Sequence, residues 1–344
     1  NGFDAKRLYQ VVFTAQDPYV LGIGLAAWRD VGHFFKHASK DDEGTANPVA
    51  NLVKHSIGRG ISQSGNFLRG WLHLGFNQAE QGGLVHEGAW PIIAGRRIAL
   101  NFRWAQPDGV LELYQAGSEG PQWWLPHPDP VRGLPAAGIL DRCLATNTCP
   151  KIVEHFGSAE VWALKLTPEW VGTDAKADLP LPENVRRYYI ASSTHGGGAG
   201  GQSSGTLALA NKKDLGFPTL PGLRPTIPEP DFIMPVFDYD WGPQFNALDA
   251  SGIPSNAPPK IKQILKMYAP KVDQDGNELG GVPVALLDAP LGTCLGWNIT
   301  AGGDKPFHKD QICDYVGGMI PFARTAAERT ADQDPRLSCQ SSTP

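Results

Sequence analysis

The segment Gly60–Gly65, Gly-Ile-Ser-Gln-Ser-Gly, contains the residues best suited to nucleophilic chemistry. A serine hydroxyl is a weak nucleophile, and enzymes activate it on a sharp strand-to-helix turn beside a general base. Such a turn needs small residues two positions before and two positions after the serine. For Ser62 these positions hold Gly60 and Ser64, whereas for Ser64 they hold Ser62 and Asn66, a poorer fit. The pattern predicts Ser62 as the nucleophile, with a Gly/Ser-rich turn without chemistry as the alternative.

The general base is expected where a later strand of the sheet ends. The predicted strand 185–191 runs through Ser-Ser-Thr into His195, which three glycines follow. A histidine in such a loop can reach a nucleophile at the same edge of the sheet and accept its proton. We therefore predict His195 as the base, against the alternative of an ordinary surface histidine. The backbone N–H of Gln63, directly after the nucleophile, is the expected first oxyanion donor.

The third member of a serine triad is a carboxylate that orients the histidine and stabilises its cation. Glu160 lies four residues past the predicted strand 151–156, in the order and position that this role requires. We predict Glu160 as that carboxylate. Four other carboxylates are weaker alternatives for this role: Glu87, Glu154, Asp174 and Asp178.

Alternating strands and helices must position these three residues. One predicted strand runs into Gly60, and the others are 84–94, 151–156 and 185–191. Helical spacing marks 24–38 and 67–74, and the apolar face expected for the first helix comprises Trp28, Val31, Phe35 and Ala38. Strands that alternate with helices predict an α/β fold with a mostly parallel sheet and flanking helices.

The chain is expected to comprise a catalytic core, residues 1–200, and a Pro/Gly-rich C-terminal region, 201–344, that packs on it. Segment 105–140 is predicted as an insertion or lid. Its Trp123 and Trp124 are candidates for the wall of a substrate pocket; the alternative is that they pack the insertion onto the sheet. Asp273–Asn277 resembles half a calcium loop, but position 12 is Val284 instead of glutamate, so a β-turn is the simpler interpretation.

Charge and cysteine usage restrict the function further. The net charge is −5 and no block of five like charges occurs, so we expect no nucleic-acid partner. The longest apolar stretch has ten residues, so we expect no membrane span. Cys143 and Cys149 are spaced for a small disulfide loop better than for zinc, which predicts an oxidising, secreted or periplasmic location and no metal. The pairing of the other three cysteines, Cys294, Cys313 and Cys339, stays open.

Together these motifs resemble the bacterial alpha/beta hydrolase domain-containing protein family, a group of serine hydrolases. The resemblance implies the α/β-hydrolase fold, in which Ser62, Glu160 and His195 follow in that chain order. It also implies hydrolysis of a small-molecule carboxylic ester without a cofactor. The matching segments are 2–4, 8–9, 24–30, 60–65, 101–104, 149–151, 158–162, 185–189, 194–198, 273–278, 292–298, 321–323 and 334–336.

The chain departs from the family pattern before the predicted nucleophile. Only 59 residues precede Gly60, whereas the family carries several strands there. We therefore expect the N-terminal strands to be missing from this chain or to come from a second chain. The same three residues could also serve an acyltransferase or a peptidase, and a non-catalytic binding scaffold is the alternative from another class.

Overall fold

The structure is a computed structural model, and it describes most of the first 195 residues and shorter pieces beyond them. The described residues are 2–4, 16–17, 22–94, 121–131, 133–162, 166–174, 178–195, 236–240, 242–243, 255–256, 260–265, 270, 272–282, 284–296, 298–299, 312–313 and 318–322.

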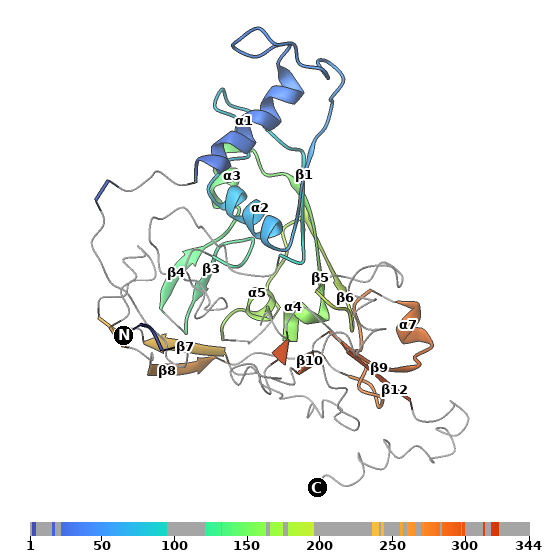
Figure 1. The fold of residues 1–344 in the computed structure, drawn as a ribbon. Coiled ribbons are helices and arrows are strands. Elements are labelled where there is room, and N and C mark those ends of the chain that lie inside the picture. Colours follow the sequence, from blue (N-terminus) through green and yellow to red (C-terminus); the bar gives the residue numbers. More distant parts are fainter. Residues whose placement is uncertain are drawn as a thin grey trace.

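Four strands form a parallel sheet in the described part of the chain, in the order β1-β2-β5-β6 (Figure 1). This confirms the predicted α/β architecture with a parallel sheet. Because all four strands run the same way, the segments that follow β1, β5 and β6 leave the sheet at one edge. The strands are β1 (Ile57–Ile61), β2 (Gly88–Ile92), β5 (Lys151–Gly157) and β6 (Val185–Ile190).

Helices cover one face of this sheet, and α2 packs on both β1 and β2. Figure 1 shows α1, α2 and α3 on the same side of the strands. The described helices are α1 (Ile23–His37), α2 (Gln63–His73), α3 (Asp141–Thr146), α4 (Ser158–Trp162), α5 (Pro168–Val171) and α7 (Ala285–Asp288). None of them is long and apolar enough to cross a lipid bilayer.

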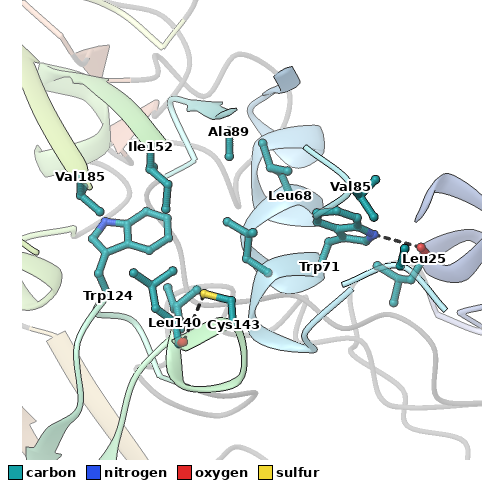
Figure 2. Close-up of a cluster of buried hydrophobic side chains, with 13 residues drawn as sticks. Leu25, Leu68, Trp71, Val85, Ala89, Trp124, Leu140, Cys143, Ile152 and Val185 are labelled. Atoms are coloured by element: carbon teal, nitrogen blue, oxygen red, sulfur yellow. Dashed lines mark hydrogen bonds between the residues drawn. The ribbon is translucent and has the colours of Figure 1, made fainter. Parts of the chain in front are cut away.

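The hydrophobic core lies between the sheet and these helices (Figure 2). From α2, Leu68 and Trp71 point into it, and the Trp71 indole N–H donates to Leu25 O of α1 at 3.0 Å. From the sheet, Ile152 and Val185 face Trp124. Burial of large apolar side chains at this layer fixes α2, and therefore the turn before it, against the strands.

The predicted apolar face of α1 was wrong. Trp28 packs against the core, but Val31 is 51% exposed and Phe35 is 41% exposed. The buried residue of α1 is Leu25, one turn before Trp28. The face of α1 that contacts the rest of the fold continues through Gly32, which lies against His86, and Lys36, which donates to Val85 O. Neither a glycine nor a lysine adds to the apolar periodicity, so the pattern did not find this face.

The opposite face of the sheet is exposed among the described residues. The strands alternate between buried and exposed side chains, as in the pattern of β1, and apolar side chains stand on the outer face. Parallel sheets are normally covered on both faces. The exposed apolar side chains are Ile57, Ile61, Trp90, Val153 and Tyr188.

In the described residues, four antiparallel pairs accompany the main sheet. They are β3 (His127–Asp129) with β4 (Leu134–Ala137), β7 (Val236–Asp240) with β8 (Lys260–Leu265), β9 (Gly292–Leu295) with β12 (Gly318–Pro321), and β10 (Asn298–Ile299) with β11 (Ile312–Cys313).

Residues 105–120 and 132 of the predicted insertion, and the predicted boundary at residue 200, lie outside the described residues.

The predicted disulfide between Cys143 and Cys149 is confirmed, with a Cα–Cα distance of 4.8 Å. It joins α3 to the start of β5 and so anchors the segment that leads into that strand. Cys294 is a buried free thiol whose pKa is raised to about 11 by burial. Cys339 lies outside the described residues.

Candidate active site

Ser62 occupies a strained turn between β1 and α2. Its backbone has φ 56° and ψ −118°, a combination that residues with a side chain rarely adopt. The Ser62 N–H donates to Ile92 O of β2 at 2.8 Å, which ties the turn to the neighbouring strand. Strain of this kind persists only where the surrounding structure fixes it, and it is often found at functional sites.

Glycines make this turn sterically possible. A Cβ on Gly60 would lie 2.2 Å from the backbone oxygen of Ser64, so no side chain fits there. This is the physical reason for the small-residue rule that marked the segment. A Cβ on Gly65 would lie 2.6 Å from the Ala94 Cβ, so the close contact of α2 with the end of β2 also needs glycine, a constraint the sequence analysis did not predict.

His195 follows the end of β6 and faces Ser62. The Ser62 Oγ lies 2.7 Å from His195 Nε2, which is hydrogen-bonding distance. His195 is buried, whereas Ser62 is partly exposed. The two side chains meet because β1 and β6 end at the same edge of the parallel sheet.

Glu160 completes the group from α4, which directly follows β5. Its Oε1 lies 2.5 Å from His195 Nδ1, and its Oε2 accepts a hydrogen bond of 2.5 Å from Gly157 N–H. Burial raises the pKa of the Glu160 carboxyl, and the bond to His195 partly offsets that rise. Both carboxyl oxygens thus have donors, which compensate for the lost hydration.

A family model described as an alpha/beta hydrolase domain matches residues 1–331, nearly the whole chain. The chain belongs to the alpha/beta hydrolase domain family. No curated protein and no solved structure matches it.

Two of the alternative carboxylates of this hydrolase domain have other partners. Glu154, fully buried on β5, accepts from Arg187 Nε at 2.6 Å and from the Trp124 indole N–H at 2.9 Å. Glu87 pairs with Lys36 and accepts from Ser56 N–H at 2.8 Å. Because Glu87 precedes β2, it lies at the sheet edge opposite Ser62. The remaining alternatives, Asp174 and Asp178, follow α5 further along the chain.

Trp123 and Trp124, the residues predicted to form the wall of a substrate pocket, are both buried. Trp124 is 2% exposed and belongs to the hydrophobic core. Trp123 is also buried, and its indole N–H donates to Ala137 O at 2.6 Å. Trp124 packs this segment onto the sheet, whereas Trp123 contacts the β3–β4 pair through Ala137 and the ring of His127.

The predicted oxyanion donor, Gln63, is the first residue of α2. The N–H groups of a helix's first turn have no partner inside the helix, so they can bind developing negative charge. Ser64, the other candidate nucleophile, is exposed one residue further into the helix. No group of three or more metal-ligating side chains gathers in the described parts of the hydrolase domain.

The sequence analysis missed the hydrogen-bonding groups at the start of α4, the helix that carries Glu160. They are the Gly157 N–H, the Ser158 hydroxyl and Glu278, whose Oε1 accepts from Ser158 Oγ at 2.6 Å. Glu278 directly follows Asp273–Asn277, the segment that was assigned to a β-turn after the calcium pattern failed. Its place next to that segment was the one feature that drew attention to it. The sequence does not predict its contact with Ser158, because the two residues are separated by 120 positions in the chain.

Proposed function

We propose that this chain is a serine hydrolase that cleaves carboxylic esters through an acyl-enzyme. The observation that carries the proposal is the continuous contact from Ser62 Oγ to His195 Nε2 and from His195 Nδ1 to Glu160 Oε1. Membership of the alpha/beta hydrolase domain family supports it. The ester bond type rests on the resemblance to that family.

In the proposed first step, Ser62 Oγ attacks the ester carbonyl carbon while His195 Nε2 accepts the serine proton. Glu160 holds the Nδ1–H of the imidazole, which leaves Nε2 free to accept and stabilises the cation that forms. The negative charge on the carbonyl oxygen is stabilised by the Gln63 N–H at the start of α2. When the tetrahedral intermediate collapses, the ester C–O bond breaks and His195 returns its proton to the leaving alcohol.

In the second step, water attacks the acyl-enzyme carbonyl and His195 Nε2 takes a proton from that water. Collapse releases the carboxylic acid and restores the Ser62 hydroxyl. The tight turn at Gly60 favours both steps because it holds Ser62 Oγ at the sheet edge that His195 also reaches. An alcohol or amine in place of water would make the same residues an acyltransferase, so product analysis with a competing alcohol separates the two reactions.

The test is intact-mass analysis before and after reaction with a fluorophosphonate, which labels activated serines, together with hydrolysis of an ester panel. We expect a single addition that maps to Ser62, and loss of both labelling and hydrolysis in Ser62→Ala. Ser64→Ala is the matched control, since it removes a neighbouring exposed hydroxyl from the same turn. It should keep both activities.

Two results would contradict the proposal. Labelling at Ser64 instead of Ser62 would show that Ser64 is the nucleophile and that the proposal names the wrong serine. Folded protein that neither reacts with the probe nor hydrolyses any ester would favour a non-catalytic scaffold.

We also propose that a second chain supplies strands to this sheet. In the described residues β1 pairs with β2 alone, and Ile57 and Ile61 stand exposed on it. A second polypeptide in the untreated native mass spectrum would support this proposal, and a single mass would refute it.

We propose in addition that the protein works in an oxidising compartment, secreted or periplasmic. The disulfide between Cys143 and Cys149 supports this, because such bonds persist mainly outside the reducing cytosol. Cell fractionation of the source organism, with antibody detection, tests the location.

A further inference from the structure

A buried carboxylate from the C-terminal part of the chain lies beside the loops that carry Glu160 and His195. Glu278 ends the turn Asp273–Glu278 and is 7% exposed. The turn is closed internally, because Asp273 Oδ1 accepts from the N–H groups of Asp275 and Asn277 at 2.8 and 2.9 Å. Asp273 is thus used inside the turn, whereas the Glu278 carboxylate bonds residues outside it.

The Glu278 carboxylate accepts three hydrogen bonds from three segments. Its Oε1 accepts from Ser158 Oγ at 2.6 Å. Its Oε2 accepts from Tyr189 OH at 2.6 Å and from Ser192 N–H at 2.8 Å. Burial raises the pKa of Tyr189 well above its usual value, so its hydroxyl stays a donor at neutral pH. Hydrogen bonds to an ionised carboxylate are among the stronger ones in proteins.

Two of these donors lie next to the proposed triad. Ser158 is the first residue of α4, two positions before Glu160, and Ser192 is three positions before His195. The same two loops also touch directly, because Ala159 N–H donates to Ser193 O at 3.2 Å. A displacement of either loop would therefore change the contact between Glu160 and His195.

The local backbone explains why such a tie is needed. Ser192 has φ 54°, a conformation that is costly for a residue with a side chain. Its N–H is held by the Glu278 carboxylate, and its Oγ accepts from Glu278 N–H at 3.3 Å. Two bonds to one residue thus hold this turn in place directly before the histidine loop.

We propose that Glu278 is a positioning residue, which fixes Glu160 and His195 relative to each other by bonding both the start of α4 and the turn before His195. This inference rests on the proposed function for its kinetic consequences. Removing the carboxylate leaves three buried donors without an acceptor and lets both loops relax. A misplacement near 1 Å can lower the rate by about 100-fold, so Glu278→Ala should lower kcat by about 10- to 100-fold. KM should change by less than about threefold, because Glu278 acts through the two loops and not on the substrate.

The experiment compares ester hydrolysis by the whole protein with that of Glu278→Ala, Glu278→Gln and Asn277→Ala. The glutamine keeps an acceptor oxygen, so it should restore kcat to within about fivefold of wild type. Asn277 is the matched control because it is also buried and lies in the same turn. Its side chain donates to Gly292 O at 3.2 Å and accepts from Cys294 N–H at 2.8 Å, so its bonds do not involve Ser158 or Ser192. Asn277→Ala should keep kcat within about threefold.

A second readout does not depend on turnover. The proton between His195 Nδ1 and Glu160 Oε1 should give a far-downfield resonance in the proton NMR spectrum, because that contact is short and buried. We expect this resonance in wild type, Asn277→Ala and Glu278→Gln, and its loss or broadening in Glu278→Ala. If wild type shows the resonance but hydrolyses no ester, the proposed function fails while the positioning role can still be read from the spectra.

Equal kcat and an unchanged resonance in Glu278→Ala would overturn the inference and leave the proposed function intact. Equal losses in Asn277→Ala and Glu278→Ala would also overturn it, since the effect would then belong to the turn as a whole. Should Glu278→Ala not fold, Ser158→Ala decides the question. It removes one donor from the carboxylate and should lower kcat by about three- to tenfold with KM unchanged, and an unchanged kcat would refute the positioning role.

Discussion

Gly60→Ala tests whether the backbone turn, and not only the side chains of the triad, makes Ser62 reactive. The added Cβ would lie 2.2 Å from Ser64 O, 2.5 Å from Ser64 C and 2.7 Å from Gly65 N. Contacts under 3.0 Å with backbone atoms cannot be relieved by a rotamer change. The start of α2 must therefore move away from β1 by about 1 Å, and Ser62 lies between the two.

The expected effect follows from that displacement. A shift near 1 Å at the nucleophile should lower the rate of fluorophosphonate labelling and of ester hydrolysis by about 100-fold. Crowding of this kind should also lower the free energy of unfolding by about 1–3 kcal/mol. Labelling rate, steady-state kinetics and urea unfolding measure the three quantities on the same preparation.

Gly58→Ala is the matched control for stability. Gly58 lies two residues earlier on β1, and its added Cβ would lie 2.7 Å from Trp28 Cη2, a side-chain atom of the core. We expect a comparable loss of stability with labelling kept within about threefold of wild type. If Gly60→Ala folds and is labelled at the wild-type rate, the argument that the turn holds Ser62 in its reactive position is refuted.

Three further predictions concern the rest of the described structure. Ser62→Ala should lower kcat/KM for any ester cleaved by wild type by about 10⁴-fold or more; a loss under tenfold would contradict the proposed nucleophile. Glu169 has a pKa raised by burial from 4.5 to about 8, although its Oε2 lies 3.1 Å from Arg69 Nη2, so the free energy of unfolding should fall as pH rises between these values. In urea unfolding at pH 5 and pH 8, Glu169→Gln should show a smaller loss of stability than wild type, and equal losses would refute this. Replacing Cys143 and Cys149 by alanine removes a loop with a separation of 6 residues and should cost about 2 kcal/mol, read from the urea midpoint; an unchanged midpoint would contradict it.

The central part of the site could be predicted because its constraints are local. The turn at Ser62 demands small neighbours within a few residues, and the strands before Glu160 and His195 are short segments rich in β-branched and aromatic residues. The structure accordingly brings these three side chains together at one sheet edge. Their catalytic roles stay a proposal until the nucleophile is labelled.

The boundary of β2 shows why other features were missed. The sequence predicted a strand over 84–94, but the strand is Gly88–Ile92. Val85 is fully buried without belonging to a strand, because the side chain of Asn77 bonds the backbone N–H and C=O of His86 and fixes that loop. A buried loop residue and a buried strand residue leave the same apolar pattern in the sequence.

Glu278 was missed for a different reason. Its partners Ser158 and Ser192 lie 120 and 86 residues earlier in the chain. No spacing rule relates a residue in a turn to loops so far away, and composition gives no sign that its carboxylate is buried. Contacts of this kind become visible only when the tertiary structure is known.

The long-range tie to Glu278 also has a consequence for biosynthesis. Ribosomes add about 5–20 residues per second, and domains begin to fold during synthesis. The β1-β2-β5-β6 sheet can form once residue 190 has emerged, but the carboxylate that joins the loops of Glu160 and His195 emerges almost 90 residues later. Contacts between distant segments also form slowly, because loop closure precedes their stabilisation. The nascent chain therefore passes through a stage in which the sheet is present and the hydrogen-bond network around the histidine is still incomplete.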